Sequence, residues 1–215
     1  MSGKRDAYYV TQRAIRNTQH EIERITTMDN LLHGQLVRLA AANSETDAET
    51  MARWSRNAEY LRMLDSEPAA PQSVKQAKGN IAKWMEHEQA NSFGFMIRAL
   101  ADDRLIGFVG LGGINWNHGD GFVGIGIGET DYWGQGYGTD AMRVLLRFAF
   151  DELNLHRVSL SVYAYNLRAI RSYEKADFQV EGRARQVVHR DGQRADEVFM
   201  GVLREDWERR RKARK

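Results

Sequence analysis

Glycines concentrate between Gly107 and Gly138, and the densest part of this run joins a predicted strand to a predicted helix. Residues 122–128 have the apolar alternation of a strand. Residues 141–149 place apolar side chains at helical spacing on one face. Glycine has no Cβ, so the connecting backbone can adopt positive φ and approach another group closely. The chain must therefore contain a strand–loop–helix unit whose loop backbone is free of bulk.

This loop, ETDYWGQGYGTDAM (residues 129–142), has the properties of a phosphate-binding turn. The start of a helix offers unpaired N–H groups and a positive dipole end. A Rossmann fingerprint reads G-x-G-x-x-G, with an acidic residue ending the next strand. Here the spacing is G-x-G-x-G, and Asn166 follows the next strand. No G-K-[ST] follows, which excludes a Walker loop. A tight turn without a ligand remains an alternative.

A second motif, VYAYNLRAIRSYEKADF (residues 162–178), places Asn166 where a predicted strand gives way to a predicted helix. Asparagine is a good helix cap and also a donor and acceptor for an amide ligand. Tyr173 lies seven residues later, two turns along nearly the same face. Both side chains are expected at the end of the sheet that carries the glycine loop. Simple capping and simple packing are the alternative readings.

The remaining periodicities predict an α+β domain with a mixed sheet. A capping box, Thr46-x-x-Glu49, is expected to start one helix, and Ser73 to cap another. Asp191-Gly192 predicts a two-residue hairpin. The expected strands are residues 35–39, 93–100, 105–114, 122–128, 157–163, 178–188 and 195–202, with a further helix at 167–175.

Composition narrows the class of protein. The 215 residues carry a net charge of +2 and no cysteine, which excludes disulfides, thiolate metal sites and a cysteine nucleophile. The weak charge disfavours a specific nucleic-acid partner. The six histidines show no metal-ligand spacing, so no metal is expected. No apolar run suits a bilayer span or a signal peptide, so a cytoplasmic protein without a membrane partner is expected.

The chain divides into three parts. Residues 1–30 are expected to form an N-terminal extension, helical in part or packed on a neighbouring subunit of a homodimer; both alternatives stay open. Residues 31–208 are expected to form the folded domain. Residues 209–215 are a basic run, expected to be a solvated tail, with a weak contact to RNA or an acidic partner as the alternative.

From about His33 to about Trp207, the chain resembles the GNAT superfamily of N-acetyltransferases. The likeness is to the branch of ribosomal-protein and spermidine acetyltransferases. Three segments carry it in order: YWGQGYGTDA, NLRAIRSYEKADF and RDGQRADEVFMGVLREDW. The family loop often begins with Gln or Arg, where this chain has Trp133. The glycine before the closing Phe is Asp177, which tolerates a left-handed helix end.

The resemblance implies a mostly antiparallel mixed sheet, flanked by helices, with a splayed strand pair that holds acetyl-CoA as co-substrate. The strands are expected to separate after Phe122. The backbone before the loop would then meet the pantetheine amides, and the loop would meet the pyrophosphate. The expected contact residues are Gly126, Ile127, Gly128, Trp133, Gly134, Gln135, Gly136, Tyr137, Gly138, Thr139, Asn166 and Tyr173.

The resemblance also implies direct attack of an amine on the thioester in a ternary complex. Tyr173 is the expected general acid, since a phenol is protonated at neutral pH and can donate to a leaving thiolate. Glu129 is the nearest carboxylate in sequence, and it is expected to serve as general base through a water molecule. Its alternative is a solvated residue at a strand end.

The acceptor is not specified by the sequence: a protein N-terminus, a polyamine, an amino sugar or another small amine all remain open. The expected neighbours of the acceptor are Arg53, Trp54, Asn57 and residues 189–191. The competing class is a non-catalytic acetyl-CoA or nucleotide-binding module. An NAD-binding oxidoreductase is a second rival.

Overall fold

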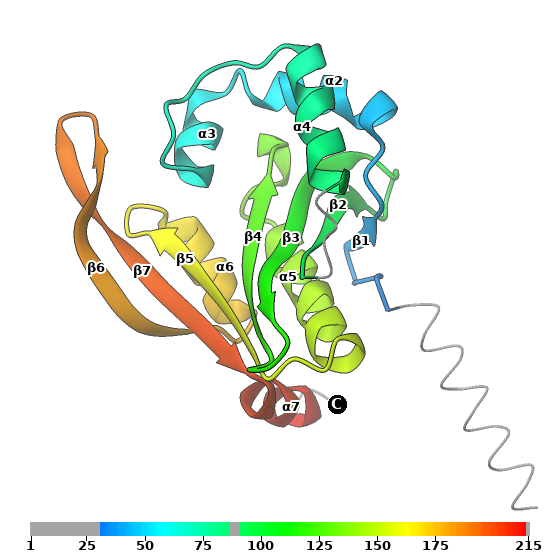
Figure 1. Ribbon diagram of the computed structural model, residues 1–215, viewed down its shortest axis with the longest axis vertical. Coiled ribbons are helices and arrows are strands. Elements are labelled where there is room, and N and C mark those ends of the chain that lie inside the picture. Colours follow the sequence, from blue (N-terminus) through cyan, green and yellow to red (C-terminus); the bar gives the residue numbers. More distant parts are fainter. Residues whose placement is uncertain (1–30, 87–90, 214–215) are drawn as a thin grey trace, which may run out of the picture. The chain divides into compact units, whose positions relative to one another are not determined.

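The computed structural model describes residues 31–86 and 91–213, so the expected N-terminal extension, residues 1–30, lies outside the described residues. Residues 33–215 form one compact unit. Its centre is a seven-stranded sheet of order β1-β2-β3-β4-β5-β7-β6 (Figure 1). Neighbouring strands are antiparallel except β4 and β5, which are parallel. The expected α+β class and mostly antiparallel mixed sheet are confirmed.

The elements follow the predicted order. The strands are β1 (Val37–Ala40), β2 (Phe93–Ala99), β3 (Leu105–Asn115), β4 (Asp120–Ile127), β5 (Arg157–Tyr163), β6 (Gln179–Arg190) and β7 (Gln193–Leu203). The helices are α2 (Ser44–Trp54), α3 (Ala58–Leu64), α4 (Val74–Glu86), α5 (Tyr137–Arg147), α6 (Leu167–Lys175) and α7 (Arg204–Ala213). A short 3-10 turn, Thr130–Tyr132, precedes the glycine loop, and a π-helical turn, Phe148–Glu152, follows α5.

Helices cover both faces of the sheet. Successive side chains of β2 point to opposite faces and so pack against different helices. Phe93 and Phe95 make edge contacts with Phe148 at the end of α5, with ring centroids 5.3 Å apart in each pair. Met96 points the other way and joins a buried cluster. That cluster draws Ala48 and Ala52 from α2, Tyr60 from α3, Ala77 and Ile81 from α4, and Trp54 and Leu105.

Two local predictions in the first helical region are wrong. The cap of α2 is Asn43, whose side chain accepts from the Glu45 N–H at 3.0 Å, so the Thr46–Glu49 capping box does not form. The helix also ends at Trp54 and restarts at Ala58. Asn57 causes the restart, because its Oδ1 accepts from the Tyr60 N–H at 3.1 Å and caps α3.

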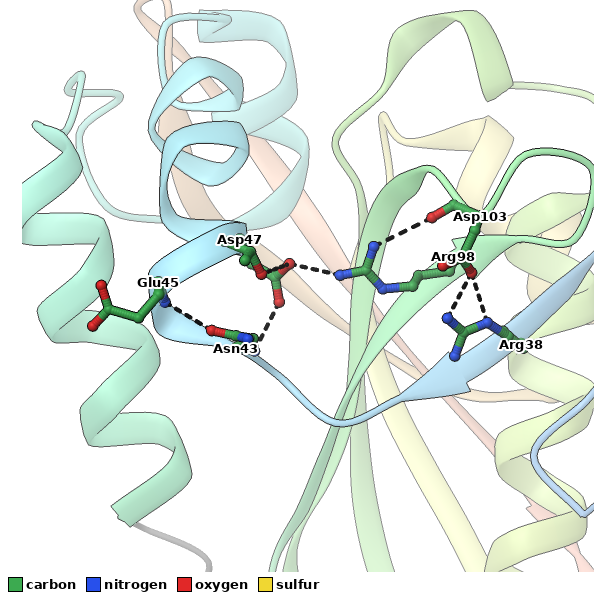
Figure 2. Close-up of polar contacts among 7 residues, drawn as sticks. Arg38, Asn43, Glu45, Asp47, Arg98 and Asp103 are labelled. Atoms are coloured by element: carbon green, nitrogen blue, oxygen red, sulfur yellow. Dashed lines mark hydrogen bonds and ion pairs between the residues drawn. The ribbon is translucent and has the colours of Figure 1, made fainter.

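A buried carboxylate ties the start of α2 to the sheet. Asp47, 1% exposed, accepts from the Asn43 N–H and pairs with Arg98 of β2 at 2.7 Å (Figure 2). The Arg98 guanidinium also donates to the carbonyl of Asp103. The Asp103 side chain binds Arg38 of β1. This network fixes α2 on the β1–β2 edge.

Other turn predictions are confirmed. Ser73 caps α4 in a reciprocal arrangement: its Oγ accepts from the Gln76 N–H, and Gln76 Oε1 accepts from the Ser73 N–H. Asp191 and Gly192 have φ of 51° and 73°, as a type I′ hairpin requires. Asp177 has φ of 79° just beyond α6, so the left-handed helix end is kept.

The basic run at the C-terminus is partly structured. Arg209 to Ala213 belong to α7, whereas residues 214–215 lie outside the described residues. Arg210 pairs with Asp177 at 3.2 Å, and Arg211 pairs with Asp151 at 2.7 Å. The run therefore anchors α7 to the ends of α5 and α6 over the part that the structure describes. No helix among the described residues is long and apolar enough to cross a membrane.

Candidate active site

The sheet splits between β4 and β5. The two strands pair only over Asp120–Phe122 and Arg157–Ser159, and then diverge toward the end near α3 (Figure 1). Beyond Phe122, the edge of β4 that faces β5 is open to the gap, while its other edge stays paired with β3. A cavity of about 860 Å³ fills the gap between the two strands, α3 and the starts of α5 and α6. The splay expected after Phe122 is thus confirmed.

The glycine loop forms one wall of this cavity. Gly134 and Gly136 have φ of 75° and 95°, in the region that favours glycine. Gly136 is the residue before α5, and the first-turn N–H groups that follow it have no carbonyl partner within the helix. Gly138 lies in that first turn, where an added Cβ would make an ordinary contact, 3.6 Å from Ser172 Oγ. The turn is therefore open to an anion.

Nine of the expected contact residues line the cavity. They are Gly126, Ile127, Trp133, Gly134, Gly136, Gly138, Thr139, Asn166 and Tyr173.

The other expected contact residues have structural roles outside the lining. Gly128 lies against the Trp54 indole, where a Cβ would come within 2.0 Å of the ring. Gln135 donates its side-chain amide to the carbonyl of Asp131. Tyr137 makes an edge contact with Tyr132, with ring centroids 4.8 Å apart. These three shape the loop around the cavity.

Trp133 explains how the loop is held without the Gln or Arg frequent in the family. Its indole N–H donates to the carbonyl of Ile127 at 2.7 Å, which fixes the loop to the end of β4. The Arg168 guanidinium lies over the indole ring, 3.6 Å from its centroid. The tryptophan thus positions a cation of α6 at the cavity wall.

Asn166 holds the strand-to-helix junction at the opposite wall. It is 8% exposed, and its Oδ1 accepts from the Ala169 N–H at 3.1 Å, capping α6. Its Nδ2 donates to the carbonyl of Met63 at 3.4 Å, which links α6 to α3. The expected capping role is present, and it serves a residue that lines the cavity.

The Tyr173 side chain reaches the cavity two turns after Asn166. Its ring packs against Phe178, with centroids 6.2 Å apart. Among residues 31–86 and 91–213, the structure gives its hydroxyl no hydrogen-bond partner. Burial raises the pKa of Tyr173 to about 12. The phenol is therefore neutral at physiological pH and has a hydroxyl free to donate.

Glu129 occupies a different environment from either alternative expected for it. It is 5% exposed, so it is not a solvated strand end, and it does not line the cavity. Its carboxylate binds Arg53, Arg104 at 2.6 Å and the Trp54 indole N–H at 2.8 Å. Burial would raise the pKa of Glu129, but these hydrogen bonds and cationic charges lower it overall. A carboxylate held so firmly is suited to a structural role and not to proton abstraction.

The residues expected to neighbour the acceptor also lie outside the cavity lining. Arg53 and Trp54 bind Glu129, and Asn57 caps α3. None of the three lines the cavity. The hairpin tip instead closes against α3, because Asp191 pairs with Arg62 at 3.0 Å. The neighbouring Arg190 donates to the carbonyl of Asp65 at 2.7 Å.

Several lining residues were not identified from the sequence. Burial raises the pKa of Tyr60, a further phenol at the β4 wall. The carboxylates of Asp140 and Glu197 also reach the lining. The charged remainder is cationic and comes from α5 and α6: Arg143, Arg168, Arg171 and Lys175. The three on α6 recur at i, i+3 and i+7, so the helical period carried a signal that could have identified them.

A cavity at a splayed parallel strand pair, beside a glycine-rich helix start, is the arrangement that the resemblance to N-acetyltransferases implies. The model of the acetyltransferase (GNAT) domain matches residues 37–179. The chain belongs to this family of acyltransferases.

Individual relatives agree with this assignment. The chain is 32% identical over 169 residues to "Probable N-acetyltransferase YjcK" of Bacillus subtilis, covering 75% of this chain and 91% of the relative. It is 28% identical over 151 residues to the prophage-derived N-acetyltransferase YokL of the same organism, covering 70% and 81%.

Solved structures share the fold. A spermidine N-acetyltransferase from Vibrio cholerae, in complex with CoA and spermine, aligns with a TM-score of 0.69 and 24% identity. The alignment covers 80% of this chain and 98% of that protein. A crystal structure described as a probable acetyltransferase aligns with a TM-score of 0.72 and 24% identity, covering 80% and 96%.

Proposed function

We propose that this protein transfers the acetyl group of acetyl-CoA to a primary amine. The observation that carries the proposal is the meeting of three features in one cavity. These are the open backbone edge of β4, the glycine-rich start of α5 and the free hydroxyl of Tyr173. A non-catalytic binding module would need the first two but not the third.

The charges and shape of the cavity fit coenzyme A. The first turn of α5 would receive the pyrophosphate, because its N–H groups are unpaired and Gly138 leaves room. The cations of α5 and α6 favour a polyanion at the same end. The β4 edge from Gly124 to Ile127 would pair with the pantetheine amides as a further strand does.

When bound, acetyl-CoA supplies an activated acyl group, and the chain supplies position and protons. The β4 edge and the glycine loop orient the thioester. Tyr173 donates its hydroxyl hydrogen toward the leaving sulfur, which stabilises the developing thiolate. The sequence has no cysteine. Direct attack by the amine is therefore the route we propose, without an acyl-cysteine intermediate.

The acceptor class rests on the same site and on the names of relatives. YdaF of Bacillus subtilis, 28% identical over 138 residues, has a name that suggests a ribosomal N-acetyltransferase. The Vibrio cholerae neighbour is a spermidine acetyltransferase. Both act on amines by name, which supports a primary amine here. A protein N-terminus and a polyamine are the two acceptor types to test first.

The test combines binding with turnover. Isothermal titration calorimetry with acetyl-CoA and with NAD separates the acyltransferase from an oxidoreductase. A thiol-release assay over peptides, polyamines, amino sugars and alkylamines then measures transfer. We expect acetyl-CoA but not NAD to bind, and at least one amine to release free thiol. Acetyl-CoA binding without acetyl transfer to any amine would instead favour the binding module.

A further inference from the structure

The charged side chains of the cavity are divided between its two ends. The cationic residues all come from α5 and α6, beside the glycine loop. The lining contains two carboxylates, those of Asp140 and Glu197. Asp140 is already satisfied, since its Oδ2 accepts from the backbone N–H groups of Leu36 at 2.7 Å and Val37 at 3.1 Å. Glu197 is therefore the lining carboxylate that is available to a ligand.

Glu197 lies on β7, across the cavity from the cationic end. Its registered partner on β5 is Tyr163, so the two side chains share one face of the sheet. Both line the cavity. Tyr165 and Asp65 are the other ionisable groups near Tyr163. This end of the cavity is bounded by α3 and by the hairpin tip that closes onto it.

The Glu197 side chain is partly buried, and it makes no hydrogen bond or ion pair within the described part of the chain. Its neighbour Asp196 points to the opposite face. There the Asp196 carboxylate binds Arg183 at 3.3 Å and the Gln186 N–H at 3.0 Å. A partly buried carboxylate without a partner can form a charge-assisted hydrogen bond to a bound cation. A cationic ligand in the cavity would supply the missing partner.

We propose that Glu197 holds the ammonium group of the acceptor and receives its proton, an inference that rests on the proposed acetyl transfer. The carboxylate accepts a hydrogen bond from R–NH₃⁺ and takes one proton, leaving R–NH₂. The nitrogen lone pair then forms the C–N bond to the acetyl carbonyl, and the C–S bond breaks. The second amine proton is lost from the product nitrogen to solvent, and the thiolate receives its hydrogen bond from Tyr173.

The test compares Glu197→Gln with Asp196→Asn. Both variants remove one negative charge from the same strand, but only Glu197 lines the cavity. We expect Glu197→Gln to lower kcat/KM for an alkylamine by about 100-fold or more at neutral pH, the usual scale of general base catalysis. Its acetyl-CoA affinity and melting temperature should stay near those of the wild type. Asp196→Asn should keep kcat/KM within about threefold.

A series of amines gives a readout that a structural role would not move. An alkylamine with a pKa of about 10.4 needs a base at neutral pH, whereas a peptide α-amine with a pKa of about 7.7–8.0 is partly free. The loss of kcat/KM caused by Glu197→Gln should therefore become smaller as the pKa of the acceptor amine falls. Wild-type rates in Glu197→Gln, or an equal loss for all amines, would overturn the assignment of Glu197. Failure of the wild type to acetylate any amine would instead overturn the proposed function and this inference together.

Discussion

Two ionisable side chains, Glu129 just after β4 and Tyr173 in α6, show opposite effects of their surroundings on protonation. Glu129 is surrounded by donors and has no capacity left for a ligand. The Tyr173 ring packs against Phe178, and burial raises the pKa of its hydroxyl, which is left free at the cavity wall. The contacts of Glu129 stabilise its negative charge, whereas the burial of Tyr173 keeps its phenol protonated. Each leads to a measurement on a single residue.

Replacing Tyr173 with Phe keeps the ring and its packing on Phe178 but removes the proton. We expect the single-turnover rate of acetyl transfer to fall by about 100-fold or more, while acetyl-CoA affinity changes little. Because burial raises the pKa of Tyr173 to about 12, the phenol stays neutral throughout the assay range. The ratio of wild-type to variant rates should therefore be constant between about pH 6 and 9. A wild-type rate in the variant would exclude Tyr173 as the acid.

Replacing Glu129 with Gln tests its structural role. The pKa of Glu129 is lowered in the folded protein from 4.5. Its stabilising contribution should thus be present above that value and be lost as pH falls through the lower folded pKa. We expect the variant to be less stable by about 1–3 kcal/mol at neutral pH, with the difference shrinking in acid. Urea unfolding across pH measures this, with exposed Glu152→Gln as control. A difference independent of pH would contradict it.

At the scale of elements, α5 and α6 form one wall because the first turn of α5 meets the second half of α6. Thr139 Oγ1 lies 2.8 Å from Ser172 Oγ, joining the two helices at mid-cavity. Gly136 and Gly138 at the start of α5 and Asn166 at the start of α6 all line the same cavity. One start is opened by glycine and the other is capped by asparagine, so the two can be tested separately.

Replacing Gly138 with Ala separates stability from binding. Gly138 is within α5, and the added Cβ would make ordinary contacts at 3.6 Å and 3.7 Å. The helix should gain about 0.5–1 kcal/mol, which a melting curve measures. Acetyl-CoA affinity should fall about tenfold, because the methyl group occupies the anion turn. Gly136 is unsuitable for this test, since its φ of 95° would strain any side chain.

Gly79 provides the matched control for that substitution. It lies in α4, and a Cβ there would meet nothing within 4 Å. Gly79→Ala should raise stability similarly and leave acetyl-CoA affinity unchanged. If Gly138→Ala behaved like Gly79→Ala in calorimetry, the start of α5 would not be the anion site.

Replacing Asn166 tests the α6 cap. Asn166→Ala should cost about 1 kcal/mol of stability, because the Ala169 N–H loses its acceptor. Asn166→Ser retains a capping oxygen but loses the bond from Nδ2 to Met63. Comparable stability of the Ser variant and the wild type, by urea unfolding, would show that capping dominates. Equal destabilisation by Ser and Ala would show that the link to α3 matters more.

The elements themselves were largely predictable, because their signals are local. The glycine loop, the Ser73 cap and the Asp191-Gly192 turn each act over a few residues, and all formed as predicted. The start of α2 was missed because Asn43 competes with Thr46 as a cap, and no local rule ranks the two in this context. The break before α3 was missed because apolar spacing continues across Asn57.

The residues of the site were predictable from the sequence only where they belong to such local motifs. Nine predicted residues line the cavity, but Glu129 was misread because its partners are distant in sequence: Arg53 is 76 residues away. Glu197 was missed for the same reason. Strand alternation puts it on a face opposite Asp196, but only the sheet order brings that face to the cavity.

At the scale of the whole molecule, the cavity has a cationic end and an end with one available carboxylate. This polarity predicts that acetyl-CoA affinity depends on salt. Raising NaCl from about 0.05 M to about 0.5 M shortens the Debye length to about 4 Å and should weaken binding about tenfold. Arg171→Gln should show a smaller salt dependence in calorimetry, whereas the exposed Arg56→Gln should match the wild type. Equal slopes would show that Arg171 does not contribute.

The short pairing of β4 with β5 has a mechanical consequence. Three residues on each strand join the two halves of the sheet at that point, whereas β5 and β7 pair over seven. We expect this narrow join to bend as a hinge, with the six residues from Phe122 to Ile127 as a lever about 17 Å long. A rotation of about 5° at the hinge moves the far end of β4 by about 1.5 Å relative to β5. Small twists of the sheet at this join would therefore produce larger changes in the width of the groove that we propose for the thioester and the amine.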